Sequence, residues 1–223
     1  MIYTIASIKG GTGKSTIATN LSVLCAQNNF TTLLVDADKQ RSSFDFISVR
    51  SAESLSPSVT SCVVYGKTAG MEISKLSKNF DITIVDVGGT DSTTLRSCLL
   101  STNILLIPIL PSQFDVWSLE QMNSLLEEVV QINNEIQVLT ILNKKDTNPN
   151  VGIADDFLNI LSDFTCIKEI NYFLGYRIAF RHALTLGKSV GEMCKKDIKA
   201  ITEMEKIFKG VFLNEEETSR KQC

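Results

Sequence analysis

The feature that most constrains this chain is a glycine-rich segment between an apolar run and a helical pattern. Residues 3–8 form the run, residues 9–16 read Lys-Gly-Gly-Thr-Gly-Lys-Ser-Thr, and the helical pattern covers residues 15–28. Glycines let a backbone fold into a concave turn without Cβ clashes. The N–H groups of such a turn, beside a helix N-terminus, attract phosphate oxygens. The sequence therefore predicts a phosphate-binding loop directly after the first strand.

Short apolar runs alternate with helical patterns along the 223 residues of the chain. Several runs lack a polar alternation, as expected of strands buried on both faces of a parallel sheet. We expect strands at residues 3–8, 32–37, 62–65, 82–87, 104–109 and 137–142, and helices at 15–28, 93–100, 116–132, 151–161, 178–186 and 192–212. This order predicts an α/β fold: a doubly wound, mostly parallel sheet flanked by helices. Residues 1–213 would form the single domain, and residues 214–223 a polar, flexible tail.

Three aspartates lie at the ends of predicted strands. Asp36 and Asp38 follow the apolar part of the second strand, and Asp86 ends the strand at residues 82–87. The carboxyl ends of strands border the ligand crevice in such sheets, and the alternation of Asp36 with Asp38 lets both face the same side. Because Mg²⁺ prefers oxygen ligands and keeps several waters, the Asp86 carboxylate and the Ser15 hydroxyl predict a magnesium site.

The loop at residues 9–16 departs from the common pattern G-x-x-x-x-G-K-[ST], because Ile8 takes its first position. With the additional Lys9, it resembles the variant loop K-G-G-x-G-K-[ST] of the ParA/MinD ATPases. Residues 36–40 and 108–115 are also similar to stretches of that family. Lys39 stands where the family has a proline, and Gly88-Gly89 follows Asp86 in place of a proline pair. The resemblance implies a P-loop NTPase fold of the SIMIBI type.

The same resemblance implies an ATPase that binds ATP and Mg²⁺ and closes into a homodimer. Lys9 would reach the nucleotide of the partner subunit, Lys14 would bind the β- and γ-phosphates, and Asp38 would position the attacking water. The metal-binding residues would be Ser15, Asp36 and Asp86, with the two carboxylates acting through water. The nucleotide-binding residues would be Gly10, Gly11, Thr12, Gly13, Lys14, Ser15, Thr16 and Asn143.

The base of the nucleotide has two candidate identities. Residues 143–146, Asn-Lys-Lys-Asp, match the N-K-x-D element with which GTPases hold guanine. A carboxylate such as that of Asp146 can accept two hydrogen bonds from the guanine edge. The ParA/MinD resemblance instead implies ATP, with Asn143 on the adenine edge. We expect ATP because the loop with Lys9 is the more discriminating signal, and GTP stays an alternative.

Basic residues gather toward the C-terminal end, although the net charge of the whole chain is -3. A DNA-binding surface must therefore be a local patch, and lysines and arginines can bind DNA phosphates without reading sequence. Residues 176–192 resemble a stretch of short, ParF-like partition ATPases. The resemblance implies non-specific DNA binding, a ParB-like or ParG-like centromere-binding partner, and a cytoplasmic, nucleoid-associated protein. The DNA-binding residues would be Arg177, Lys188, Lys195 and Lys196.

Three other functions stay open at this point. The apolar stripe of the helix at residues 192–212 would attach a MinD-like ATPase to a membrane, or pack on the sheet. Stable insertion is not expected, because no apolar run reaches the ~20 residues that span a bilayer. The cargo could be a protein assembly rather than DNA. A metabolic enzyme or metal-cluster carrier could reuse the fold, but the six cysteines include no C-x-x-C pair.

Overall fold

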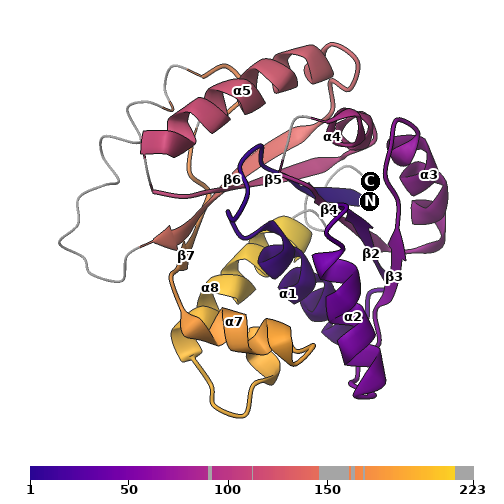
Figure 1. Cartoon of the computed structure of the whole chain (residues 1–223), viewed down its shortest axis with the longest axis vertical. Helices are drawn as coiled ribbons and strands as arrows, with labels where there is room; N and C mark the ends of the chain where they lie inside the picture. The colour runs from indigo at the N-terminus through magenta and orange to yellow at the C-terminus, as the bar shows by residue number, and fades with distance from the viewer. Residues whose placement is uncertain (90–91, 112, 146–160, 162–163, 168, 214–223) are drawn as a thin grey trace.

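The computed structural model describes residues 1–89, 92–111, 113–145, 161, 164–167 and 169–213, apart from the side chains of residues 113–116. Seven strands form one sheet in the order β3-β2-β4-β1-β5-β6-β7, and every neighbouring pair is parallel (Figure 1). The strands are β1 Ile2–Ile5, β2 Thr32–Ala37, β3 Thr60–Val63, β4 Ile82–Val87, β5 Ile104–Ile109, β6 Gln137–Lys145 and β7 Tyr172–Gly175. The predicted α/β class and parallel sheet are confirmed.

Helices cover both faces of the sheet (Figure 1). On one face lie α3 (Ala69–Leu76), α4 (Thr93–Leu99) and α5 (Gln113–Val130), and on the other lie α1 (Lys14–Gln27), α2 (Ser42–Ala52), α7 (Ile178–Thr185) and α8 (Ile198–Phe208). Every residue of β1, β2, β4 and β5 is buried as a result. This double cover explains why these strands read as apolar runs without alternation.

Two short 3₁₀ turns, at Ser77–Asn79 and Val190–Glu192, and a π turn at Lys209–Leu213 complete the described elements. The prediction of one helix over residues 192–212 was wrong at its start. Residues 193–197 are not helical, and α8 begins at Ile198 because the Asp197 carboxylate caps it by accepting a hydrogen bond from Ala200 N (3.1 Å). The prediction also missed α2, α3 and β7.

The apolar stripe of α8 packs on the sheet. Ala200, Met204, Ile207 and Phe208 are buried in the same core cluster as α1 and β1. None of the helices within the described ranges is long and apolar enough to cross a bilayer. The predicted tail at residues 214–223, Asp146 and nearly all of the predicted helix at 151–161 lie outside the described residues.

The topology places one edge of the sheet in position to hold a ligand. β1 lies between β4 and β5, so the chain moves away from it toward opposite edges in its two halves. Crevices form at the carboxyl ends of the strands at such a point. The loop between β1 and α1 therefore opens into the position where α/β proteins bind nucleotides.

Candidate nucleotide-binding site

The loop between β1 and α1 has the backbone conformation that its glycines allow. Gly11 and Gly13 have φ values of +75° and +98°, in the left-handed region that favours glycine. Gly13 precedes α1, and a Cβ atom there would lie 2.2 Å from Asn143 Nδ2. A side chain at position 13 would thus be both strained and obstructed.

Lys14, the first residue of α1, is buried within this loop at 7% exposure. Its Nζ donates to the Lys9 carbonyl (3.1 Å) and to Ser7 Oγ (3.3 Å). Burial lowers the pKa of Lys14, while the nearby Asp86 and Asp38 carboxylates oppose that change. A largely desolvated ammonium in a glycine-rich loop at a helix N-terminus is well placed to bind an anion.

Asp36, at 0% exposure on β2, holds the start of α2. Its Oδ2 accepts hydrogen bonds from the N–H groups of Ser43 (2.8 Å) and Phe44 (2.9 Å), and its Oδ1 accepts one from Asp38 N (3.0 Å). The residue before α2 makes no side-chain cap, so Asp36 satisfies these helix-end donors from another element. Burial nonetheless raises the pKa of Asp36.

Asp86, on β4, is opposite Asp36 on the neighbouring strand and is 1% exposed. Ser43 Oγ donates to its Oδ2, whereas its Oδ1 has no hydrogen-bond partner among the described residues. Burial raises the pKa of Asp86 to about 7, opposed by the hydroxyls of Ser15 and Ser43. A buried carboxylate oxygen without a donor, close to the Ser15 hydroxyl, fits an oxygen-ligated divalent cation such as Mg²⁺.

Asp38 borders the cleft beside the glycine pair that follows β4. Its Oδ1 accepts a hydrogen bond from Gln40 N (3.0 Å). A Cβ atom on Gly88 would lie 3.2 Å from this carboxylate, and one on Gly89 would lie 3.0 Å from Lys14 Nζ. The two glycines therefore let the segment after β4 approach the phosphate loop and Asp38 closely.

Asn143 and Lys144, at the end of β6, contact the backbone of the phosphate loop. Asn143 Nδ2 donates to the Thr12 carbonyl (2.6 Å), and its Oδ1 accepts from Lys144 N (2.8 Å). Lys144 Nζ donates to the Gly11 carbonyl (2.8 Å). Both ends of the Asn143 amide are thus engaged with backbone, which gives this residue a role in shaping the loop.

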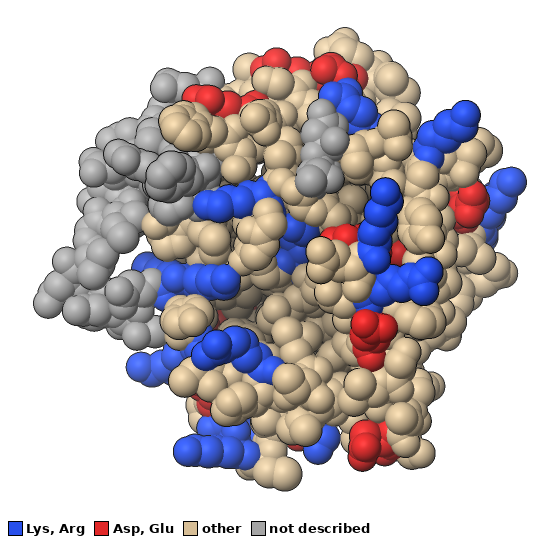
Figure 2. Space-filling view, in the orientation of Figure 1, with Lys and Arg blue, Asp and Glu red and all other residues tan. Residues whose placement is uncertain are grey.

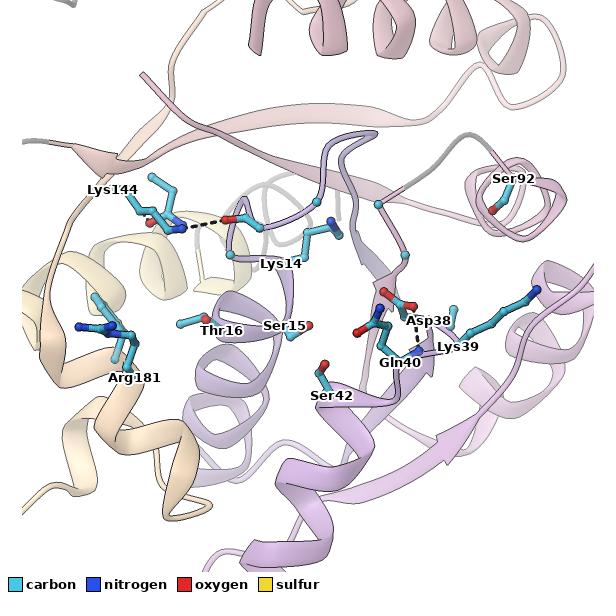
Figure 3. Close-up of a pocket in the computed structure, with 18 of the residues that line it drawn as sticks. Lys14, Ser15, Thr16, Asp38, Lys39, Gln40, Ser42, Ser92, Lys144 and Arg181 are labelled. Atoms are coloured by element: carbon cyan, nitrogen blue, oxygen red, sulfur yellow. Dashed lines mark hydrogen bonds between the residues drawn. The ribbon is translucent and has the colours of Figure 1, made fainter. Parts of the chain in front are cut away.

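The phosphate loop, Asp38, the Gly88-Gly89 pair, Asn143 and Lys144 line a cleft of about 810 Å³. In Figure 3, Lys14, Ser15 and Asp38 lie at its phosphate end, and Lys144 and Arg181 lie toward the opposite side. Figure 2 shows the hollow on this face with several lysines and arginines around it. Tyr176 and Phe180 line the cleft beside Arg181. The cleft thus has a cationic phosphate end and an aromatic end that suits a nucleoside.

The predicted loop residues lie together at this cleft, whereas Lys9 and three of the four predicted DNA-binding residues lie outside its lining. Lys9 is half-buried and lines a small separate pocket with Pro108 and Ser118, and it is not part of the lining of the cleft. Arg177 is paired with Glu203 at 2.6 Å and lines the cleft. Lys196 donates to the Gly191 carbonyl, Lys195 is exposed, and Lys188 is half-buried.

Sequence reasoning missed several contributors to this site. Ser43 escaped notice because the prediction contained no α2 to bring its hydroxyl to Asp86. Lys144 was read only as part of a base-recognition pattern, although it contacts the phosphate loop. Tyr176 and Arg181 were not predicted as cleft residues, because their place there depends on β7, which the prediction also lacked.

Comparison with known proteins agrees with this geometry. Residues 3–182 match the model of the CobQ/CobB/MinD/ParA nucleotide binding domain family. The chain is 26% identical over 210 residues to the maintenance of carboxysome distribution protein A of Halothiobacillus neapolitanus, covering 93% of this chain and 94% of that protein.

Solved structures share the fold at lower identity. A plasmid partition protein of Borrelia burgdorferi bound to AMPPNP is 19% identical, with a TM-score of 0.70 over 96% of this chain and 98% of that one. The Cyanothece McdA–ATP complex has a TM-score of 0.73 at 17% identity, over 94% and 95% of the chains. MinD of Pyrococcus horikoshii with Mg-ADP has a TM-score of 0.72 at 15% identity, over 95% of each. The chain therefore belongs to the CobQ/CobB/MinD/ParA family of nucleotide-binding domains and is of the ParA/MinD ATPase type.

Proposed function

We propose that this protein is an ATP-dependent dimer switch that binds DNA non-specifically and positions a plasmid or chromosome with a centromere-binding partner. The observation that carries the enzymatic part is the buried Lys14 in a glycine-rich loop, facing the carboxylates of Asp86 and Asp38. This arrangement supports binding of a triphosphate and Mg²⁺, and a polar group at Asp38 to orient water.

In this proposal Lys14 and the N–H groups of residues 10–16 bind the phosphates. Ser15 would hold Mg²⁺ directly, and Asp86 and Asp36 would hold it through water; the ion would supply positive charge that stabilises the transferring phosphoryl group. Asp38 orients the attacking water. Lys9 reaches across the dimer and neutralises charge on the partner's nucleotide, so hydrolysis depends on dimerisation.

ATP is the proposed nucleotide. The family match supports it, and neighbours in fold carry AMPPNP, ATP or Mg-ADP. The contacts of Asn143 with Thr12 and Lys144 support an indirect role at the base end, in which Asn143 shapes the loop. A competition titration of bound fluorescent ATP with unlabelled ATP and GTP tests the choice, and preference for GTP would reverse it.

The DNA-binding part rests on the cations of the C-terminal third, Arg177, Lys188, Lys195 and Lys196. The pairing of Arg177 with Glu203 leaves less of its charge for a phosphate. The exposed Lys145, Lys199 and Lys206 line a neighbouring groove between β7 and α8 and add to the local positive charge. A ParB-like or ParG-like partner would stimulate slow hydrolysis and thereby release the DNA.

A second candidate is a positioning ATPase for a protein assembly. The match along 93% of this chain to a carboxysome distribution protein favours it. Deleting the gene from its host separates the two roles. Loss of a plasmid or missegregated chromosomes supports partition, and a mispositioned protein body with faithful DNA inheritance supports the second candidate.

The enzymatic proposal is tested by sedimentation and phosphate release with Mg²⁺-ATP, using wild type and Lys9→Ala. We expect the wild type to form dimers with ATP but not with ADP, and to hydrolyse ATP slowly. Lys9→Ala should still bind ATP but lose hydrolysis. A wild type that stays monomeric and releases no phosphate, with or without its partner, would refute the switch.

A further inference from the structure

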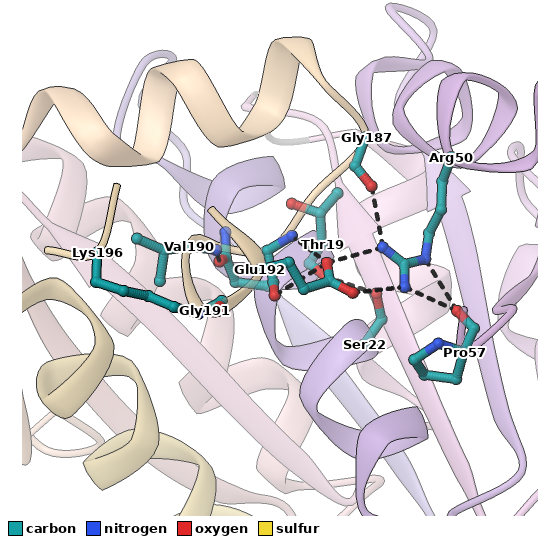
Figure 4. A network of polar contacts seen from close by, with 11 residues as sticks. Thr19, Ser22, Arg50, Pro57, Gly187, Val190, Gly191, Glu192 and Lys196 are labelled. Atoms are coloured by element: carbon teal, nitrogen blue, oxygen red, sulfur yellow. Dashed lines mark hydrogen bonds and ion pairs between the residues drawn. The ribbon is translucent and has the colours of Figure 1, made fainter. Parts of the chain in front are cut away.

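Arg50, near the end of α2, is buried, with 1% of its surface exposed. All five N–H donors of its guanidinium are used (Figure 4). Two go to the Pro57 carbonyl (3.0 and 2.8 Å), one to the Gly187 carbonyl (3.1 Å) and two to the Glu192 carboxylate (2.9 and 2.8 Å). A bidentate pair of this kind has strict geometry, so Glu192 must move with the end of α2.

Residues 187–192, here named the 187–192 turn, are held closely by this contact. Glu192 Oε2 also accepts a hydrogen bond from Ser189 N (2.8 Å), which closes a capping box at the Val190–Glu192 turn. Gly187 has a φ of +62°, and a Cβ atom there would lie 2.6 Å from Arg50 N. The turn therefore lies directly on the backbone of α2.

A second attachment joins the same turn to α1. The Asn20 side chain is fully buried; its Oδ1 accepts a hydrogen bond from Val190 N (2.8 Å), and its Nδ2 donates to the Thr16 carbonyl (2.8 Å). One amide thus bridges the first turn of α1 and the 187–192 turn. In Figure 4, Glu192 lies between Val190 and Arg50.

Both helices begin at the candidate nucleotide site. α1 begins with Lys14 and Ser15, and α2 begins beside Asp36 and Asp86, to which Ser43 is hydrogen-bonded. The 187–192 turn contains Lys188 and is followed by Lys195 and Lys196, the other proposed DNA contacts of this segment. The two helices therefore connect the phosphate and metal ligands to the segment that carries these cations.

We infer that Arg50, Glu192 and Asn20 are positioning residues that transmit the nucleotide state from α1 and α2 to the DNA-binding segment at residues 188–196. The inference rests on the proposed function and adds its regulation. A purely structural role for the Arg50–Glu192 pair would affect stability alike with every nucleotide. If the pair transmits the nucleotide state, amide hydrogen exchange in the 187–192 turn changes when ATP binds, and loss of the pair reduces that change.

The experiment is amide hydrogen exchange of the full chain without nucleotide, with Mg²⁺-ADP and with a non-hydrolysed Mg²⁺-ATP analogue. Arg50→Lys keeps the positive charge but removes the guanidinium that makes the bidentate pair. Glu192→Gln keeps the shape of the side chain but removes its negative charge. Arg96→Lys is the matched control, because Arg96 pairs with Glu128 (2.5 Å) between exposed side chains on α4 and α5. If Arg50→Lys does not fold, Glu192→Gln alone tests the inference.

In wild type and Arg96→Lys, the ATP analogue should slow exchange in residues 9–16 and change exchange in residues 187–196. In Arg50→Lys and Glu192→Gln, the response at 9–16 should persist, and the response at 187–196 should shrink by at least about fivefold, the lower end of ordinary allosteric couplings. An unchanged response at 187–196 in both variants, or none in wild type, would overturn the inference. No response at 9–16 in wild type would instead refute the nucleotide site.

Discussion

Two regions of the molecule carry lysines in opposite settings. At the carboxyl edge of the sheet, Lys14 is 7% exposed and lies among hydrogen-bond acceptors and carboxylates. In the C-terminal segment, Lys195 and Lys196 are exposed. The chemistry of a buried charge is determined by its neighbours in the fold, whereas an exposed charge acquires a role through a partner. The surroundings of Lys14 therefore indicate a phosphate ligand, whereas the surroundings of Lys195 and Lys196 do not by themselves indicate a partner.

The largest expected effect is at Lys14. Lys14→Ala removes the buried cation of the phosphate loop, and we expect hydrolysis to fall by about 10²–10³-fold. Lys75→Ala, on the exposed side of α3, is the control and should leave the rate unchanged. Phosphate release with Mg²⁺-ATP measures both variants. If Lys14→Ala hydrolysed ATP at a rate within a few-fold of wild type, the buried Lys14 would be no more important for hydrolysis than an exposed lysine.

Gly13→Ala tests how far the loop depends on its backbone. The positive φ and the 2.2 Å approach to Asn143 should together cost about 3 kcal/mol of unfolding free energy. Gly10→Ala is the matched variant, because its Cβ atom meets nothing within 4 Å. Urea unfolding without nucleotide compares the two. Equal stabilities would show that the loop relaxes around a side chain at position 13.

Glu192→Gln extends the comparison to a half-buried charge outside the nucleotide site. Burial alone would raise the pKa of Glu192, but hydrogen bonds from Arg50 and Ser189 outweigh it and hold the pKa below the ordinary value of 4.5. The stabilisation is therefore present above about pH 4.5 and is lost as the pH falls through the lowered pKa.

We expect Glu192→Gln to lower the unfolding free energy by about 2–3 kcal/mol at pH 7. Urea unfolding across a pH series should show this difference shrinking toward acid. A difference that stays constant from pH 7 to pH 3 would mean that the ionised carboxylate does not contribute.

The smallest effect belongs to a single exposed lysine. Lys195→Ala should weaken binding to random-sequence duplex DNA slightly and lower the slope of log K against log salt by about 0.9, the value for one phosphate contact. Lys75→Ala should leave the slope unchanged. If both variants keep the wild-type slope, Lys195 makes no phosphate contact.

The fold and the phosphate loop could be predicted because they depend on local patterns. Apolar runs marked the central strands, and the glycines with Lys14 marked the loop. The roles of Ser43, Arg50 and Glu192 could not be predicted, because each depends on a contact with residues far along the chain. Helix α8 began later than expected because Asp197 caps it, a local signal that the apolar stripe obscured.

The central claim is that the nucleotide bound in the first region controls the second. Binding to random-sequence duplex DNA, measured over a salt series with ATP, ADP or no nucleotide, tests it most directly. We expect salt-sensitive binding that requires ATP and is lost in Lys9→Ala. Equal binding in all three nucleotide states, or none in any of them, would contradict the claim.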